Sequence, residues 1–133
     1  VEKVDGKALA DLIHRQIVPV MAPLTHDGNG NLLNTNADTI AGETAKALAE
    51  YFDVTLVYCF EKKGVLRDEN DDDSVIPVLT PDLFKKYVEE GIVQGGMIPK
   101  LENSFSALDA GVSQVVITLA SAIYKDSGTI IRK

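Results

Sequence analysis

The segment Val54–Phe60 constrains the fold of this chain more than any other stretch. Its residues are almost all β-branched, aromatic or otherwise apolar, which is typical of a central strand that is covered on both faces of a parallel sheet. Apolar residues at helical spacing precede it over 38–52, and Thr80–Pro81, an N-cap followed by proline, begins a helix after it. Strands that alternate with helices predict an α/β fold with a largely parallel sheet. Cys59 is interpreted as a small residue that fills the core.

Local signals place the remaining elements. Asp5 caps a predicted helix over 5–15. A buried strand over 17–22, in which Pro19 indicates an edge or an early position, begins a hairpin that extends to residue 36. The other expected elements are an extended piece over 75–79, a helix that Gly91 ends, a helix that follows Gly95–Gly96 and that Gly111 ends, and strands over 114–118 and 128–132.

The overall charge and the cysteine count limit the partners and the compartment. The chain of 133 residues has a formal net charge of −7, which argues against nucleic acid or an anionic membrane surface as the main partner. No apolar run approaches the length of a membrane span. A single cysteine excludes a disulfide within the chain, so we expect a reducing compartment. The length suits one domain with a core, and the first residue, Val1, suggests a processed product or a fragment.

The stretch Gly91–Lys100 predicts a place to hold a phosphoryl group. Gly95 and Gly96 allow the backbone to approach a ligand, and Pro99 fits the first turn of a helix. The N–H groups and the dipole of a helix N-terminus favour an anion, and Lys100 adds a full positive charge. The alternative is an ordinary turn followed by a solvated lysine.

A polar cluster precedes the helix expected over 38–52. In an extended chain alternate side chains share a face, so Asn34, Asn36 and Asp38 are predicted to point the same way, toward a ligand. The alternative is that Asp38 caps the helix while the asparagines serve the turn, and spacing alone slightly favours this alternative.

Charged residues follow the expected strand Val54–Phe60. Ligands of open α/β sheets bind outside the carboxyl ends of strands, so Lys62 and Lys63 are predicted to face a nucleotide, unless they are only solvated. The acidic stretch 67–74 does not fit a calcium loop that begins at Asp68, because Asp73 and Leu79 occupy the positions that require glycine and glutamate. We interpret it as a solvated loop. The chain has no Walker-type phosphate loop.

Three blocks together carry a resemblance to a known family: Asn34–Gly42, Glu61–Leu66 and Gly91–Lys100. In this order and at these separations they resemble the C-terminal half of the acylglutamate kinases of the amino acid kinase family, over most of the chain. The resemblance implies a three-layer α/β sandwich with a largely parallel central sheet. It also implies that residues 1–37 end the acylglutamate-binding lobe and that residues 38–133 form the nucleotide-binding lobe.

The resemblance implies an enzyme of arginine biosynthesis. Its members transfer a phosphoryl group from ATP, with Mg²⁺ held mainly through the nucleotide phosphates, to the side-chain carboxylate of an N-acylated glutamate. They are cytoplasmic, act on small molecules and not on nucleic acids or membranes, and form homo-oligomers. The alternatives are another amino acid kinase, which acts on a different acid or on a nucleoside monophosphate, and a non-catalytic nucleotide- or metabolite-binding domain.

The resemblance also assigns roles to residues. Lys100 and Asp38 match the catalytic positions: the lysine steadies the transferring phosphoryl group and the aspartate organises the catalytic lysines. Asn34 and Asn36 belong to the substrate-binding block. The nucleotide-binding positions are Glu61, Lys62, Lys63, Gly64, Val65, Leu66, Ile92, Val93, Gln94, Gly95, Gly96 and Met97.

Three departures from the family pattern limit this assignment. The N-terminal half of the family, which carries a second catalytic lysine and a substrate-binding arginine, is not in this sequence, so we expect this chain alone to be inactive. Phe60 and Glu61 stand where the family usually has Thr or Ser followed by Asp. The segment Leu119–Ser127 is shorter than usual, which predicts a reduced or missing helix near the nucleotide.

Overall fold

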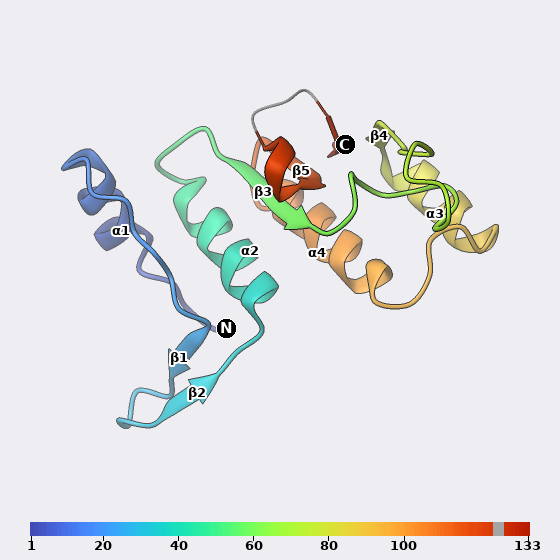
Figure 1. Cartoon of the computed structure of the whole chain (residues 1–133). Coiled ribbons are helices and arrows are strands. Elements are labelled where there is room, and N and C mark those ends of the chain that lie inside the picture. The colour runs from blue at the N-terminus through green and yellow to red at the C-terminus, as the bar shows by residue number, and fades with distance from the viewer. Residues whose placement is uncertain (124–126) are drawn as a thin grey trace.

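The computed structural model describes residues 1–123 and 127–133, and its centre is a mixed four-stranded sheet. The strands lie in the order β3 (Thr55–Phe60), β5 (Gln114–Leu119), β6 (Thr129–Ile131) and β4 (Val78–Leu79). β3 pairs with β5 in parallel and β4 with β6 in parallel, while β5 and β6 are antiparallel. The predicted α/β class with a largely parallel sheet is therefore confirmed (Figure 1).

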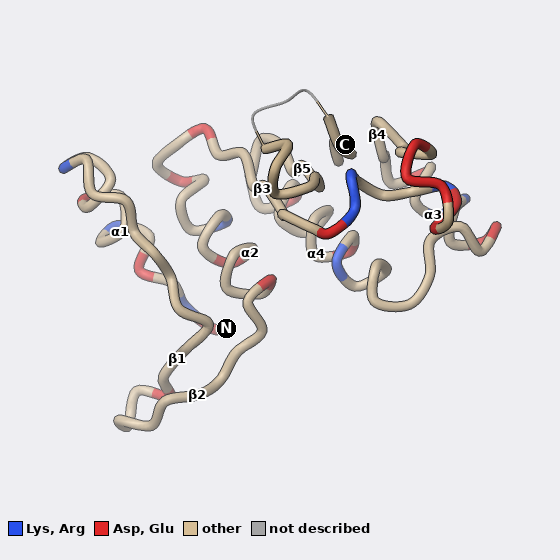
Figure 2. Tube along the Cα trace, in the orientation of Figure 1, with Lys and Arg blue, Asp and Glu red and all other residues tan. Residues whose placement is uncertain are grey.

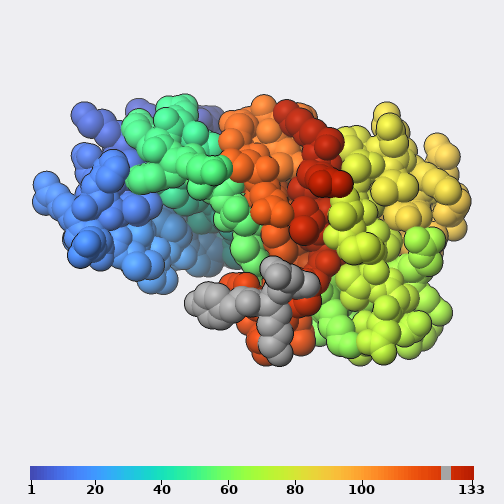
Figure 3. Space-filling view, turned by 90° about the horizontal axis from the view of Figure 1, so that it is seen from above, coloured from blue at the N-terminus to red at the C-terminus, as the bar shows by residue number. Residues whose placement is uncertain are grey.

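Three helices pack beside this sheet. α2 (Ala37–Leu48) contacts β3, α4 (Met97–Asp109) contacts β5, and the two helices also contact each other. α3 (Pro81–Glu89) lies against α4 at the far end from the N-terminal segment. The space-filling view shows the same order, from the blue N-terminal segment at one end to the yellow region of α3 at the other (Figure 3).

The helix boundaries follow from caps that the sequence contains. The Asn36 side chain accepts from the N–H of Thr39 at the start of α2, and Thr80 caps α3 with Pro81 as its first residue. Gly111 follows the end of α4 with a φ of 101°, in the left-handed region that glycine tolerates best. The helix predicted over 38–52 is therefore present but begins at Ala37 and ends at Leu48.

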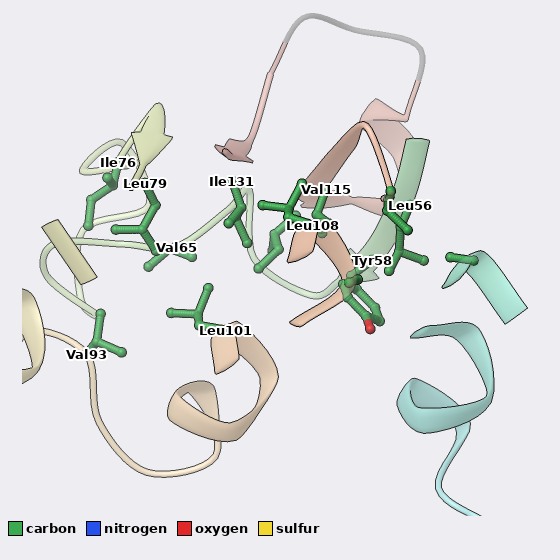
Figure 4. Close-up of a cluster of buried hydrophobic side chains, with 14 of the residues drawn as sticks. Leu56, Tyr58, Val65, Ile76, Leu79, Val93, Leu101, Leu108, Val115 and Ile131 are labelled. Carbon is green, nitrogen blue, oxygen red and sulfur yellow. The ribbon is translucent and has the colours of Figure 1, made fainter. Parts of the chain in front are cut away.

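The core fills the space between the helices and the sheet. Figure 4 shows Leu101 and Leu108 of α4 pointing toward Val115 and Ile131 of the sheet. Leu101, Val115 and Ile131 are completely buried. Burial of side chains of this size contributes about 1.5–3 kcal/mol each, so α4 is bound to the sheet mainly by apolar contact.

The strand β3 is less buried than its composition predicts. It is an edge strand of the described sheet, and Leu56 and Tyr58 are buried while Thr55 and Cys59 are exposed. The prediction of a central strand covered on both faces, with Cys59 in the core, is wrong for the described residues. Successive side chains of a strand point to opposite faces, and Tyr58 points toward α2, where it approaches Gly42. Cys59 therefore lies on the face of β3 away from α2.

The N-terminal part forms a helix and a short hairpin. α1 (Gly6–His14), which Asp5 caps as predicted, packs on α2. β1 (Leu24–His26) pairs with β2 (Leu32–Asn34) in an antiparallel hairpin. No helix in the described ranges is both long and apolar enough to cross a membrane.

The buried strand predicted over 17–22 is not observed. These residues form no regular element, and Val18 and Val20 are 83% and 93% exposed. The hairpin is correspondingly shorter than predicted, from Leu24 to Asn34. An apolar, β-branched run forms a strand only where a partner offers backbone hydrogen bonds. Within the described residues nothing pairs with this segment, and Pro19 lacks one donor.

The side chain of Thr129 joins the strand β6 to the loops beside it. Its hydroxyl donates to the carbonyl oxygen of Ile76 at 2.7 Å and accepts from the N–H of Val65 at 2.8 Å. Thr129 is completely buried, and both hydrogen bonds are buried. This one hydroxyl therefore satisfies a backbone donor and a backbone acceptor that water does not reach.

We predict that Thr129→Val destabilises the protein by about 2–4 kcal/mol, because it leaves two buried backbone groups without a partner. The matched control is Thr118→Val, since the hydroxyl of Thr118 is also buried but has no hydrogen-bond partner among the described residues. We expect this control to change the free energy of unfolding by less than about 1 kcal/mol. Urea denaturation checks both values, and equal losses in the two variants would contradict the role of Thr129.

Candidate functional site

A cavity of about 650 Å³ lies beside the carboxyl end of β3. This volume is in the range of small-molecule sites in proteins. One wall is the loop after β3, a second is the segment between α3 and α4, and two residues of the acidic loop complete it. The lining residues are Cys59, Phe60, Glu61, Lys62, Gly64, Val65, Leu66, Glu69, Asn70, Ile92, Val93, Gln94 and Met97.

The loop after β3 is held in place by close backbone packing. A Cβ atom on Gly64 would lie 2.8 Å from the hydroxyl oxygen of Thr129 and 3.0 Å from its backbone nitrogen, so only glycine fits without a shift. The next residue, Val65, is buried and donates its N–H to the Thr129 hydroxyl. The sheet therefore fixes the position of this wall of the cavity.

The lysines of this loop pair with the acidic loop. Lys62 lies 2.9 Å from Asp72 and Lys63 lies 2.6 Å from Asp73 (Nζ to Oδ1). The hydrogen bond and the charge of Lys62 hold the pKa of Asp72 below its usual value, and Asp72 in turn raises the pKa of Lys62. Lys62 lines the cavity but Lys63 does not, so the two lysines are not equivalent.

The acidic stretch is a solvated loop, as predicted. Residues 67–73 are exposed, and its carboxylates accept hydrogen bonds from nearby backbone N–H groups, as Asp68 does from Asn70 and Asp71 from Asp73. Across the described ranges no group of three or more His, Cys, Asp or Glu side chains is placed to hold a metal ion. Figure 2 shows the acidic loop in red near α3 and a blue, basic stretch that follows the end of β3.

Lys100 and Asp38 meet in an ion pair. Their Nζ and Oδ2 atoms are 3.0 Å apart, and their side chains are 17% and 38% exposed. Asp38 lies in the first turn of α2 and Lys100 in the first turn of α4, so neighbouring helix starts supply the two charges. Partial burial strengthens this pair relative to one in open solvent.

Tyr58 connects this ion pair to the sheet. Its hydroxyl donates to the backbone carbonyl oxygen of Asp38 at 3.3 Å. Burial, with an added effect of the negative charge of Asp38, raises the pKa of Tyr58 above its usual value of 10.0. The hydroxyl therefore stays protonated near neutral pH and remains a donor to the start of α2.

The start of α4 has fewer free donors than the sequence predicts. The N–H of Met97 donates to the carbonyl oxygen of Gln94, and the N–H of Ile98 donates to that of Gly95, both at 3.2 Å. Pro99 has no N–H. The full positive charge at this helix start is therefore the Lys100 ammonium, and the backbone donors contribute less than expected.

The predicted cluster of Asn34, Asn36 and Asp38 does not form a single polar face. The Asn36 side chain caps α2, so the turn alternative is correct for this residue, while Asp38 does not cap the helix and pairs with Lys100. Asn34 ends β2 and is exposed. Neither asparagine lines the cavity.

Most of the predicted nucleotide-binding residues line one cavity. The exceptions are Lys63, Gly95 and Gly96. Sequence reasoning missed Glu69 and Asn70, for which no local signal exists, and Cys59 and Phe60, which directly precede the predicted loop. In the segment 119–127, residues 120–122 form a short 3₁₀ helix, whereas 124–126 lie outside the described residues.

Comparison with known proteins places the chain among relatives about twice its length. It is 80% identical to an acetylglutamate kinase of Phocaeicola vulgatus and 75% identical to one of Bacteroides thetaiotaomicron, over the whole chain and 52% of each relative. An N-acetylglutamate synthase structure from Neisseria gonorrhoeae, complexed with coenzyme A and N-acetyl-glutamate, matches 99% of this chain and 31% of that one. Its TM-score is 0.84 at 22% identity, which supports the fold. Residues 1–119 match the amino acid kinase family, and the chain therefore belongs to that family.

Proposed function

We propose that the protein to which this chain belongs transfers the γ-phosphoryl group of ATP to the side-chain carboxylate of N-acetylglutamate or a close analogue. The proposal rests above all on the Lys100–Asp38 ion pair, because the family resemblance implies catalytic roles for these two residues and their charged groups lie 3.0 Å apart. The relatives that carry the name acetylglutamate kinase support the choice of acceptor. The product would be an acyl phosphate, with ADP as the leaving group.

We place the nucleotide in the cavity beside β3. The partly exposed apolar side chains of Ile92 and Met97 offer a surface for the base, and Lys62 at the wall offers a charge for a phosphate. The other predicted residues that line this cavity are Glu61, Gly64, Val65, Leu66, Val93 and Gln94. Residues 38–133 then act as the nucleotide-binding lobe, and residues 1–37 belong to the lobe that binds the acylated acid.

The described residues suit Mg²⁺ that arrives with the nucleotide. They offer no group of three acidic or histidine side chains for an ion bound by protein alone. Mg²⁺ bound to the phosphates would neutralise part of their charge. The work of this chain is then to orient the γ-phosphoryl group and to supply a lysine beside it.

Lys100 and Asp38 divide the catalytic work. Phosphoryl transfer depends on positioning and on stabilisation of the charge that spreads over the moving phosphoryl oxygens. The Lys100 ammonium provides that stabilisation, and Asp38 holds the ammonium in place at 3.0 Å. Asn34 contacts the acylated acid, and Asn36, through its cap of α2, fixes the helix turn that carries Asp38.

The same proposal includes the compartment, the pathway and the assembly of the protein. We place the protein in the cytoplasm, as an enzyme of arginine biosynthesis that forms a homo-oligomer, because the sequence resembles acylglutamate kinases with these properties. Calorimetric titration of the full-length protein with MgATP, with and without N-acetylglutamate, tests the two substrates directly. Binding of ATP that never responds to the acid would favour the alternative of a nucleotide-binding domain without catalysis.

We predict that Lys100→Ala in the full-length protein lowers kcat by about 100- to 1,000-fold, because the transition state loses its positive partner. Affinity for MgATP should change by less than about three-fold, since Lys100 does not line the nucleotide cavity. The control is Lys85→Ala, an exposed lysine on α3 that takes no part in the ion pair, and this variant should behave as the unchanged protein. Equal kcat values for the Lys100→Ala and unchanged proteins would exclude a catalytic role for Lys100.

We also predict that Lys62→Ala weakens MgATP binding by about three- to five-fold, as expected for loss of one exposed charge. Lys63→Ala is the matched control, since Lys63 forms the same kind of ion pair with the acidic loop but does not line the cavity. Calorimetry at low ionic strength measures both affinities. An equal change in both variants would mean that the acidic loop, and not a direct contact of Lys62, controls binding.

A further inference from the structure

Phe60 lies directly beneath the ammonium group of Lys100. The Lys100 Nζ atom is 3.5 Å from the centroid of the Phe60 ring and 5.8 Å from that of the Tyr58 ring. The same nitrogen is 3.0 Å from the Asp38 carboxylate. The ammonium is thus held on one side by a full negative charge and on another by the electron-rich face of an aromatic ring.

The contact with the Phe60 ring can restrict the conformational freedom of the Lys100 side chain. Both side chains are partly buried, and a cation–π contact gains strength where water is reduced. A lysine side chain has several rotatable bonds, and an ion pair through one of its three donors leaves its direction open. A flat surface beneath the nitrogen restricts that freedom, because it adds a second attachment in a different direction.

Phe60 also lines the cavity in which we place the nucleotide. It is therefore a boundary residue between the nucleotide and the Lys100–Asp38 pair. Its position at the end of β3 is fixed by the parallel pairing of Phe60 with Leu119. The sheet therefore fixes the position of the Phe60 ring, and the Lys100 side chain reaches this ring from α4.

We propose that Phe60 is a positioning residue for phosphoryl transfer: its ring holds the Lys100 ammonium, together with Asp38, at the edge of the nucleotide cavity. This inference rests on the proposed function for its kinetic consequence. The contact itself is independent of that function. Replacement of a residue that only lines the nucleotide cavity would change the KM for ATP and not kcat, and replacement of a purely structural residue would leave the NMR signal of Lys100 in place.

The experiment uses the full-length protein with the variants Phe60→Leu and Phe60→Tyr. The control is Phe84→Leu, because Phe84 is also a partly buried phenylalanine with an aromatic neighbour, Phe105, but lies on α3. The first measurement is ¹H–¹³C NMR of the lysine side chains, with the Lys100 signal assigned by its loss in Lys100→Ala. The second is kcat and the KM for ATP, with N-acetylglutamate as the acceptor.

We expect the ring current of Phe60 to shift the Hε signal of Lys100 upfield from those of other lysines. Phe60→Leu should return that signal to the usual range and lower kcat by about three- to thirty-fold, with the KM for ATP nearly unchanged. Phe60→Tyr should retain both the shift and kcat, since it keeps the ring. Phe84→Leu should do the same.

Several outcomes would overturn the inference. A rise in KM at constant kcat in Phe60→Leu would mean that Phe60 only lines the nucleotide site. Failure of Phe60→Tyr to keep the shift and kcat would mean that the ring face is not what matters. An unchanged protein without kinase activity would overturn the proposed function and the kinetic role of Phe60 with it. The NMR signal then still decides the contact, and a Lys100 signal among the other lysines would disprove it.

Discussion

The parallel pairing of β3 with β5 is the constraint on which the rest of the structure depends. Each of these strands is preceded by a helix, α2 before β3 and α4 before β5. Because the strands run in the same direction, the helices also run in the same direction and lie in contact (Figure 1). Their first turns are therefore neighbours, and this is why Asp38 and Lys100 form an ion pair although they are far apart in the sequence. The charge pair of the site is a consequence of sheet topology.

A second constraint connects the sheet to the cavity. The loop after β3 passes so close to β6 that Gly64 has no room for a side chain. The hydroxyl of Thr129 on β6 accepts a hydrogen bond from the N–H of Val65 and donates one to the carbonyl oxygen of Ile76. The cavity wall is thus part of the core, although its residues follow the end of a strand. A wall of this kind has its final shape before a ligand binds, so binding loses less conformational entropy. Lys62, on the same loop, remains exposed and pairs with Asp72.

Local capping signals in the sequence predict the helices correctly, whereas composition alone does not predict which segments are buried. Caps such as Asp5 and Thr80 are local, and the helices that they predict are present. The segment 17–22 has the composition of a buried strand but no partner among the described residues, so it remains exposed. The composition of β3 likewise predicts Cys59 in the core, but Cys59 is exposed, because composition does not report which face of a strand is covered. The roles of Lys100 and Asp38 are implied by the family resemblance, whereas spacing alone favours a helix cap for Asp38.

The sequence by itself determined the helices, their caps, the class of the fold and the family, because these depend on residues that are close in the chain or on motifs that appear together. Only the tertiary structure decided that Phe60 lies beneath Lys100, that Lys62 and not Lys63 lines the cavity, and that Glu69 and Asn70 belong to it. The physical reason is that these contacts join residues from separate elements. Their distances are set by strand register and by packing in the core, which no local pattern encodes.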